Sequence, residues 1–305
     1  MESKIIRGKN TYLTFKNVKT AKEIEKIIKM LLTACAIFMI IVIFSIITFV
    51  SKQGLETFKM VSPIEYFTSS YWSPFEEQFG ILTFIKGTLL LTGLSTLIGG
   101  VLGVGCAIFI SKFAPKFIKN ILRFTVEIFV GIPSVVYGYI GLTVVVPLIR
   151  RIFSNSVGFG ILPASLILSV MIMPTVITIS EDSINSVDIS FEEASYALGA
   201  TKIQTIFGVI LPCAFPGIIS SIILAMARAL GETMAVQMVI GNTPQLANSL
   251  LEPTSSLTTA IVMDIANTEF GSTWNNALFM MATVLLVISI IFILFARKLN
   301  RRSMR

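Results

Sequence analysis

The sequence alternates long apolar runs with short polar stretches. Six runs reach about 20 residues, the length of helix that crosses the hydrocarbon core of a bilayer. They cover residues 27–50, 84–110, 121–149, 161–180, 213–240 and 276–296. A further apolar stretch, 257–266, is too short to span and indicates a re-entrant or interfacial helix. We therefore predict an all-α membrane protein with six transmembrane helices.

The positions of lysine and arginine predict the orientation. With both termini in the cytoplasm, the inner segments hold 18 of the 24 basic residues and the outer loops hold 4. Basic residues accumulate on the cytoplasmic side of membrane proteins, so this bias decides the topology. The polar segment 181–211 then lies inside the cell, although it is itself acidic.

Four regions follow from the runs and the charges. They are a cytoplasmic tail at 1–26, the first span with an outer aromatic loop at 27–81, a transmembrane core at 82–297 that contains the loop 181–211, and a basic cytoplasmic tail at 298–305. Amphipathic rings favour the headgroup level, so we expect the aromatic residues of the outer loop to act as interfacial anchors. These are Phe58, Tyr66, Phe67, Tyr71, Trp72, Phe75 and Phe79.

Proline and glycine mark special points in the spans. Pro133 removes a helical hydrogen bond in the third run, so a kink or break is expected there. Small residues at regular spacing in the second run, Gly99, Gly100, Gly103 and Gly105, favour close approach of another helix.

Charges inside the apolar runs are the candidates for a transport site. Arg228 and Glu232 are four residues apart in the fifth run, which puts them on one face of a continuous helix. A charge at mid-membrane is costly and needs a reason. Either the two form an ion pair that fixes packing, or they line a path on which the planar fork of Arg228 binds an oxyanion. Glu127 in the third run is another candidate for the path.

Composition excludes several other functions. The chain is 54% hydrophobic and 13% charged, contains no histidine, and has three cysteines far apart in apolar runs. We therefore expect no metal, no redox site and no cofactor. The net charge of +7 gathers beside the spans, which argues against a nucleic-acid partner. The chain has no GxxxxGK[ST] phosphate loop, so energy for active transport comes from a partner or an ion gradient.

The polar segment carries a motif whose spacing is specific. Three residues separate Glu193, Ala194 and Ser195 from Gly199, and nine residues separate Gly199 from Val209-x-Leu211-Pro212. This pattern resembles the EAA loop of binding-protein-dependent ABC importer permeases, with Ser195 in place of alanine and Val209 in place of isoleucine. The resemblance covers about residues 82–297 and implies the type I importer permease fold in the plasma membrane.

The resemblance also implies a function and partners. GIPSVVYGYIGL from residue 131 and RALGETMAVQMVIGN from residue 228 are similar to the phosphate permease subunits of this family. They imply an importer built from this chain, a second permease, a cytoplasmic ATPase dimer and an extracytoplasmic phosphate-binding protein. Glu193, Ala194, Ser195, Gly199, Leu211 and Pro212 would then couple to the ATPase, and Arg228 and Glu232 would match the charged pair linked with phosphate passage.

Three alternatives stay open at this stage. The substrate could be another oxyanion, such as molybdate or sulfate. A gradient-driven carrier could use Arg228, Glu232 and Glu127 as a relay, although the segment that resembles the EAA loop argues against it. A purely structural or sensory membrane subunit is the remaining option.

Overall fold

The computed structural model describes residues 18–154 and 156–303, and the tail predicted at 1–26 lies largely outside this part. The chain divides into two compact units, 1–49 and 50–305, which we describe separately. In the first unit, the described residues form most of one helix, α1 (Val18–Leu55), whose apolar side chains are exposed.

The second unit is a bundle of helices with short connections. Its α-helices are α2 (Pro63–Thr68), α3 (Leu82–Ile108), α4 (Lys116–Gly131), α5 (Ser134–Ile140), α6 (Val146–Ile152), α7 (Ile161–Asn185), α8 (Ile189–Ala197), α9 (Lys202–Thr205), α10 (Leu211–Leu230), α11 (Met234–Gln237), α12 (Leu257–Asp264) and α13 (Thr273–Ser303). Short π-helical segments are η4 (Phe109–Phe113), η5 (Gly141–Val145) and η6 (Ile206–Ile210), and short 3-10 turns are η2 (Glu56–Lys59), η3 (Pro74–Glu76) and η7 (Ile265–Asn267).

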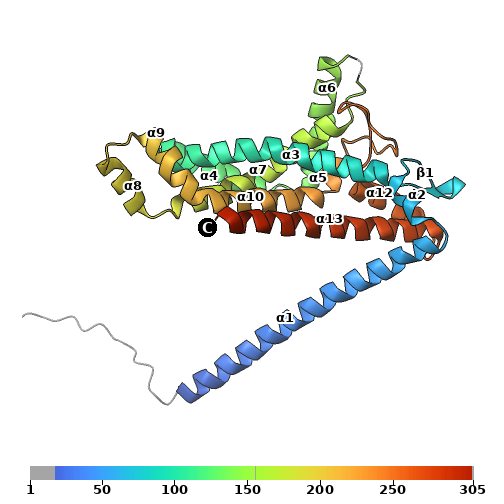
Figure 1. Ribbon diagram of the computed structural model, residues 1–305, viewed down its shortest axis with the longest axis horizontal. Coiled ribbons are helices and arrows are strands. Elements are labelled where there is room, and N and C mark those ends of the chain that lie inside the picture. The colour runs from blue at the N-terminus through green and yellow to red at the C-terminus, as the bar shows by residue number, and fades with distance from the viewer. Residues whose placement is uncertain (1–17, 155, 304–305) are drawn as a thin grey trace, which may run out of the picture. The chain divides into compact units, whose positions relative to one another are not determined.

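Six helices in the described residues are long and apolar enough to cross a membrane. They are Lys22–Lys59, Leu82–Phe113, Ser134–Ile152, Ile161–Asn185, Lys202–Leu230 and Thr273–Leu294. The predicted all-α fold with six spans is therefore confirmed. In the bundle, α8 and α9 lie at one end, and α2, β1 and α12 lie at the other (Figure 1).

The third span differs from the predicted one. Residues 121–149 were expected to form it, but α4 ends at Gly131 and a new helix starts at Ser134, after Pro133. The expected break at Pro133 is thus confirmed, and the spanning segment is Ser134–Ile152. The preceding helix α4 is too short to span and has no buried residue.

Helix α7 is the centre of the bundle and packs between α3 and α10. Two thirds of its apolar window is buried, against one third or less in the other spans. Two glycines of α3 permit this contact. A Cβ at Gly99 would lie 2.8 Å from the carbonyl oxygen of Ser169, and one at Gly103 would lie 2.8 Å from Cβ of Val176. The expected close approach is confirmed at these two positions.

The outer aromatic loop folds back into the protein. Strands β1 (Trp72–Ser73) and β2 (Gln78–Phe79) pair in antiparallel register. Tyr66, Trp72 and Phe79 are buried in a cluster with residues of α12 and α13, so they do not act as interfacial anchors as predicted. The reason is that α2 and the β-turn provide a local core for these large rings. Tyr71 and Phe75 remain exposed.

Candidate translocation and coupling sites

The motif of the polar segment lies on a short helix that has its own start and end signals. Helix α7 ends at Asn185, and α8 begins after Asp188, whose side chain accepts a hydrogen bond from the backbone N–H of Ser190 at 2.9 Å. This hydrogen bond lowers the pKa of Asp188, because it stabilises the carboxylate form. The sequence thus stops one helix and starts another within a few residues.

Gly199 ends α8 in the left-handed conformation, with φ of +82°. Its N–H donates to the carbonyl of Tyr196 at 2.9 Å, and the N–H of Ala200 donates to Ser195 at 3.2 Å. A Cβ at Gly199 would meet no atom within 4 Å, so the backbone angle and not the space requires glycine. The predicted positive φ and helix end at this residue are confirmed.

The other motif residues divide between two faces. Glu193 and Ala194 are exposed, whereas Ser195 is buried and its Oγ lies 2.9 Å from Oγ1 of Thr205. Ser195 therefore holds α8 against α9 and does not form part of the exposed face. Pro212 stands at the start of α10, directly after the π-helical turn η6, where its missing N–H is tolerated.

The end of the bundle at α8 and α9 carries large apolar side chains that are exposed in a polar segment, a pattern typical of protein–protein contact surfaces. They are Ile189, Phe191, Leu198 and Ile203, of which Leu198 is 90% exposed.

Two polar contacts tie this loop to the cytoplasmic end of α3. The Lys112 ammonium donates to Oε2 of Glu192 at 2.7 Å, and the Ser111 hydroxyl donates to Oδ1 of Asn185 at 2.6 Å. The hydrogen bond from Lys112 lowers the pKa of Glu192. These contacts connect α8 and the last residue of α7 to the π-helical turn η4, so α8 is fixed to the bundle by more than its two chain connections.

Arg228 lies in the last turn of α10, on a side that the described residues leave exposed. Its Nη1 donates to Oγ1 of Thr175 on α7 at 3.3 Å. Thr175 is ten residues before the end of α7, or roughly 15 Å along the helix. Arg228 is thus near the middle of the span, where a charge faces the protein interior or a water-filled path.

Glu232 does not share a helix face with Arg228, contrary to the prediction. Helix α10 ends at Leu230, and Glu232 follows in a non-helical connection before α11. Its Oε1 accepts the N–H of Ala235 at 3.1 Å, and its carbonyl accepts the hydroxyl of Thr258 at 3.0 Å. Within the described residues no ion pair joins Arg228 and Glu232.

Glu127 lies apart from Arg228, on α4, and lines a cavity of about 240 Å³. Arg123 and Glu181 line the same cavity, and Nε of Arg123 donates to Oε1 of Glu181 at 2.9 Å. Glu181 is almost fully buried, and Lys119 lies 3.6 Å from the same oxygen. The structure brings neither Glu232 nor Glu127 into contact with the guanidinium of Arg228.

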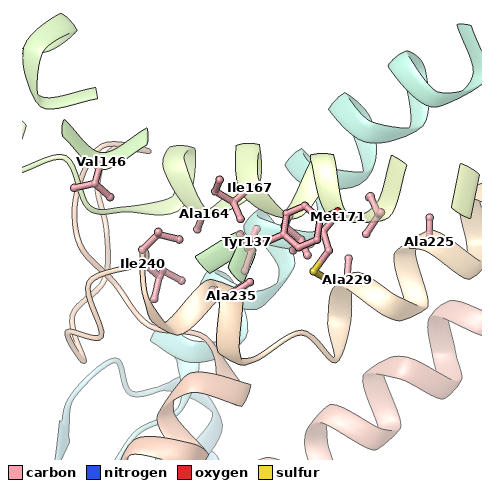
Figure 2. Packing of buried hydrophobic residues seen from close by; sticks show 14 of the residues in the cluster. Tyr137, Val146, Ala164, Ile167, Met171, Ala225, Ala229, Ala235 and Ile240 are labelled. Carbon is pink, nitrogen blue, oxygen red and sulfur yellow. The ribbon is translucent and has the colours of Figure 1, made fainter. Parts of the chain in front are cut away.

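A cluster of buried apolar side chains reaches the last turn of α10, where Arg228 lies. Figure 2 shows the ring of Tyr137 in one cluster with Met171 of α7, Ala229 of α10 and Ala235 of α11. The hydroxyl of Tyr137 donates to the carbonyl of Phe129 at 2.8 Å, which satisfies its polar end. Helices α5 and α11 both pack against α7, and the cluster they share with it contains Ala164, Ile167 and Met171 of α7.

Comparison with known proteins identifies the family. Residues 99–305 match the profile of the binding-protein-dependent transport system inner membrane component. The chain belongs to this family. It is therefore a membrane-embedded permease subunit of an ABC importer, a type that works with an ATPase and a binding protein, and it lacks an ATPase domain of its own.

Two relatives and one solved structure illustrate the similarity. A probable ABC transporter permease protein, YqgH of Bacillus subtilis, is 46% identical over 278 residues, 90% of each chain. The phosphate transport system permease protein PstC of Haemophilus influenzae is 33% identical over 251 residues, 76% of this chain and 79% of the relative. A chain of a bacterial alginate ABC transporter superposes with a TM-score of 0.64 at 20% identity, over 94% of this permease and 98% of that chain.

Sequence reasoning missed two partners that the fold supplies. Thr175 is 53 residues from Arg228, and Glu192 is 80 residues from Lys112. No spacing rule joins residues of different helices. The only available signal was polar character: Thr175 is a polar residue inside an apolar run, and Lys112 is a charged residue at the end of one.

Proposed function

We propose that this permease imports phosphate as one half of the translocation pathway of an ATP-driven importer. Its partners are a second, PstA-like permease, a PstB-like cytoplasmic ATPase dimer and a PstS-like phosphate-binding protein outside the membrane. Support for phosphate comes from the relatives named PstC, which are 31–33% identical over at least three quarters of this chain. The gradient-driven carrier is set aside, because the chain belongs to the ABC importer permeases.

The observation that carries the proposal is the position of Arg228. A guanidinium near mid-membrane, hydrogen-bonded to a threonine and without a carboxylate partner among the described residues, keeps most of its donors for a ligand. Arginine binds tetrahedral oxyanions through paired N–H groups, and its charge offsets that of the anion. Glu232 stays a proposed pathway residue on the outer side of Arg228, and Glu127 stays one on the cytoplasmic side.

The exposed face of α8 supports the proposed coupling role. Glu193, Ala194 and Gly199, together with the apolar side chains of Phe191 and Leu198, would fit a cleft on the ATPase. Closure of the ATPase dimer would then move α8. Leu211 and Pro212 would transmit that movement into α10, which carries Arg228.

The test is transport by the complete complex in reconstituted vesicles that enclose ATP, with the phosphate-binding protein in the outer medium. ATP-dependent, vanadate-sensitive uptake of radiolabelled phosphate is expected, and a large excess of sulfate or molybdate should not compete. Arg228→Gln should lower uptake at least about thirtyfold while the complex still assembles, since it removes a desolvated charge. Uptake of sulfate or molybdate in place of phosphate would overturn the substrate, and normal uptake by Arg228→Gln would overturn the site.

A further inference from the structure

Thr175 is the one side chain of the described residues that is hydrogen-bonded to Arg228. Its Oγ1 accepts the bond from Nη1 at 3.3 Å, and this contact joins α7 to α10. The two helices also pack tightly further along α7, toward its C-terminal end. Ser180 and Ser221 share a hydrogen bond at 2.8 Å, and a Cβ at Gly217 would collide with Ser183. The register of α7 against α10 therefore fixes Thr175 beside Arg228.

The hydroxyl proton of Thr175 is unused. A hydroxyl has one donor and two acceptor sites, and in a helix the donor usually bonds the carbonyl four residues earlier. Thr125 and Thr283 do so, to Ile121 at 2.9 Å and to Phe279 at 3.0 Å. Thr175 makes no such bond among the described residues, and its oxygen only accepts from Arg228.

The surroundings of Thr175 indicate that a bound ligand accepts a hydrogen bond from its hydroxyl. Thr175 is half-buried and lies roughly 15 Å from the inner end of α7, too deep for bulk solvent to reach without a path. An O–H group that already accepts from a cation is polarised, which makes it a better donor to an anion. The guanidinium and the hydroxyl together present adjacent donors with no acceptor between them.

We propose that Thr175 is a second anion-binding group, whose hydroxyl donates to one oxygen of the tetrahedral oxyanion held by Arg228. This inference rests on the proposed role of Arg228 and adds a specific partner to it. The anion oxygen that faces α7 accepts a hydrogen bond from the threonine hydroxyl, and the remaining oxygens face the N–H groups of the Arg228 guanidinium. Thr175 thereby places the anion on the α7 side of the path, one helical turn beyond Met171 of the apolar cluster around Tyr137.

The test compares three variants in the complete complex. Thr175→Val keeps the shape and removes the hydroxyl, Thr175→Ser keeps the hydroxyl, and Thr283→Val is the control, a half-buried threonine in another span. Removing a hydrogen bond to a charged group should lower the maximal uptake rate about tenfold to a hundredfold. The serine variant should stay within about threefold of wild type and the control within about twofold.

A double-mutant cycle that combines Thr175→Val with Arg228→Lys distinguishes an effect on anion binding from an effect on helix packing. If the hydroxyl and the guanidinium hold the same anion, Thr175→Val should cost at least about fivefold less in the lysine background than in the wild type. Equal uptake by Thr175→Val and wild type overturns the inference, and so does a loss that Thr175→Ser fails to restore. Full additivity in the cycle also overturns it.

The failure of this inference is distinguishable from that of the proposed function. Arg228→Gln alone tests the site, and wild-type uptake alone tests the substrate. If the complex imports sulfate instead of phosphate, the same three variants are assayed with sulfate, because the chemistry of the hydroxyl is the same for both anions. If Arg228→Gln transports normally, any effect of Thr175→Val is unrelated to anion binding and the inference is overturned.

Discussion

The loop around α8 and the region around Arg228 represent two different ways of building a functional element. The loop is defined by local signals, a cap at Asp188 and a left-handed glycine at Gly199, that act within a few residues. The region around Arg228 is defined by helix packing, because Thr175 comes from a distant part of the chain. Local signals can be recognised in a sequence, whereas the partner of Arg228 is known only from the fold.

The difference extends to how each region would respond to substitution. In the loop around α8, a substitution that disfavours the observed backbone conformation should disrupt coupling to the ATPase, while the spans stay folded. Around Arg228, loss of one hydrogen-bond donor should weaken binding of the anion and leave the coupling intact.

Among the substitutions not yet discussed, the largest effect is expected at Gly199. Gly199→Leu forces a side chain onto a φ of +82°, which costs about 1–2 kcal/mol in the loop. Uptake should fall about fivefold to thirtyfold, and ATP hydrolysis by the assembled complex should continue. The measurement is the ratio of phosphate imported to ATP hydrolysed.

Two controls test this explanation. Gly199→Asn should retain most of the uptake, because asparagine tolerates the left-handed conformation. Gly208→Ala should be neutral, since Gly208 also has open space around it but no positive φ. Normal ATP-driven uptake by Gly199→Leu would show that the helix end is not needed for coupling.

Glu232 should show an intermediate effect. Its carboxylate accepts the N–H of Ala235 at the start of α11, and glutamine can still make that hydrogen bond. We expect Glu232→Gln to lower uptake about threefold through loss of charge on the path, and Glu232→Ala to lower it about tenfold because the cap is lost as well. Equal uptake by the two variants would exclude a role for the cap.

The comparison explains what the sequence could and could not reveal. The six spans, the break at Pro133 and the conformation of Gly199 follow from run length and from single-residue backbone preferences. The predicted common helix face of Arg228 and Glu232 was wrong, because α10 ends at Leu230. Gly231 is not in the left-handed region, so the helix end there depends on tertiary packing.

The aromatic loop shows the same limit. Amphipathic rings between two spans are typical of interfacial anchors, yet Tyr66 is fully buried and its hydroxyl donates to the carbonyl of Ala277 at 2.7 Å. That carbonyl is 211 residues away, on α13. Burial raises the pKa of the Tyr66 hydroxyl, so it stays protonated and keeps this bond.

A smaller effect is expected for the Lys112–Glu192 contact. Glu192→Gln removes a partly exposed ion pair, so uptake should fall only about twofold. The lowered pKa of Glu192 means that the pair stabilises α8 above the unfolded-state pKa and is lost as the pH falls through the folded-state value.

The same contact gives a prediction on pH. Between about pH 6 and pH 8 the difference in uptake between wild type and Glu192→Gln should be constant, because Glu192 stays ionised. Amide exchange of residues 189–197, corrected for its intrinsic pH dependence, should rise in the wild type only at a pH below the ordinary pKa range of a glutamate carboxyl, because the pKa of Glu192 is lowered. A difference in uptake that varies between about pH 6 and pH 8 would contradict this assignment.

The smallest effect is expected at Ser195, where two hydroxyls meet in the interior of the loop. Ser195→Ala removes the contact with Thr205, but the Thr205 hydroxyl can turn to the carbonyl of Thr201 in its own helix. Uptake should therefore stay within about twofold of wild type, and the loop should lose at most about 1 kcal/mol. Ser195→Val should be worse, because a buried position between α8 and α9 has no room for two methyl groups. Phosphate imported per ATP hydrolysed measures both variants, and a strong loss with alanine would mean that Ser195 itself contacts the ATPase.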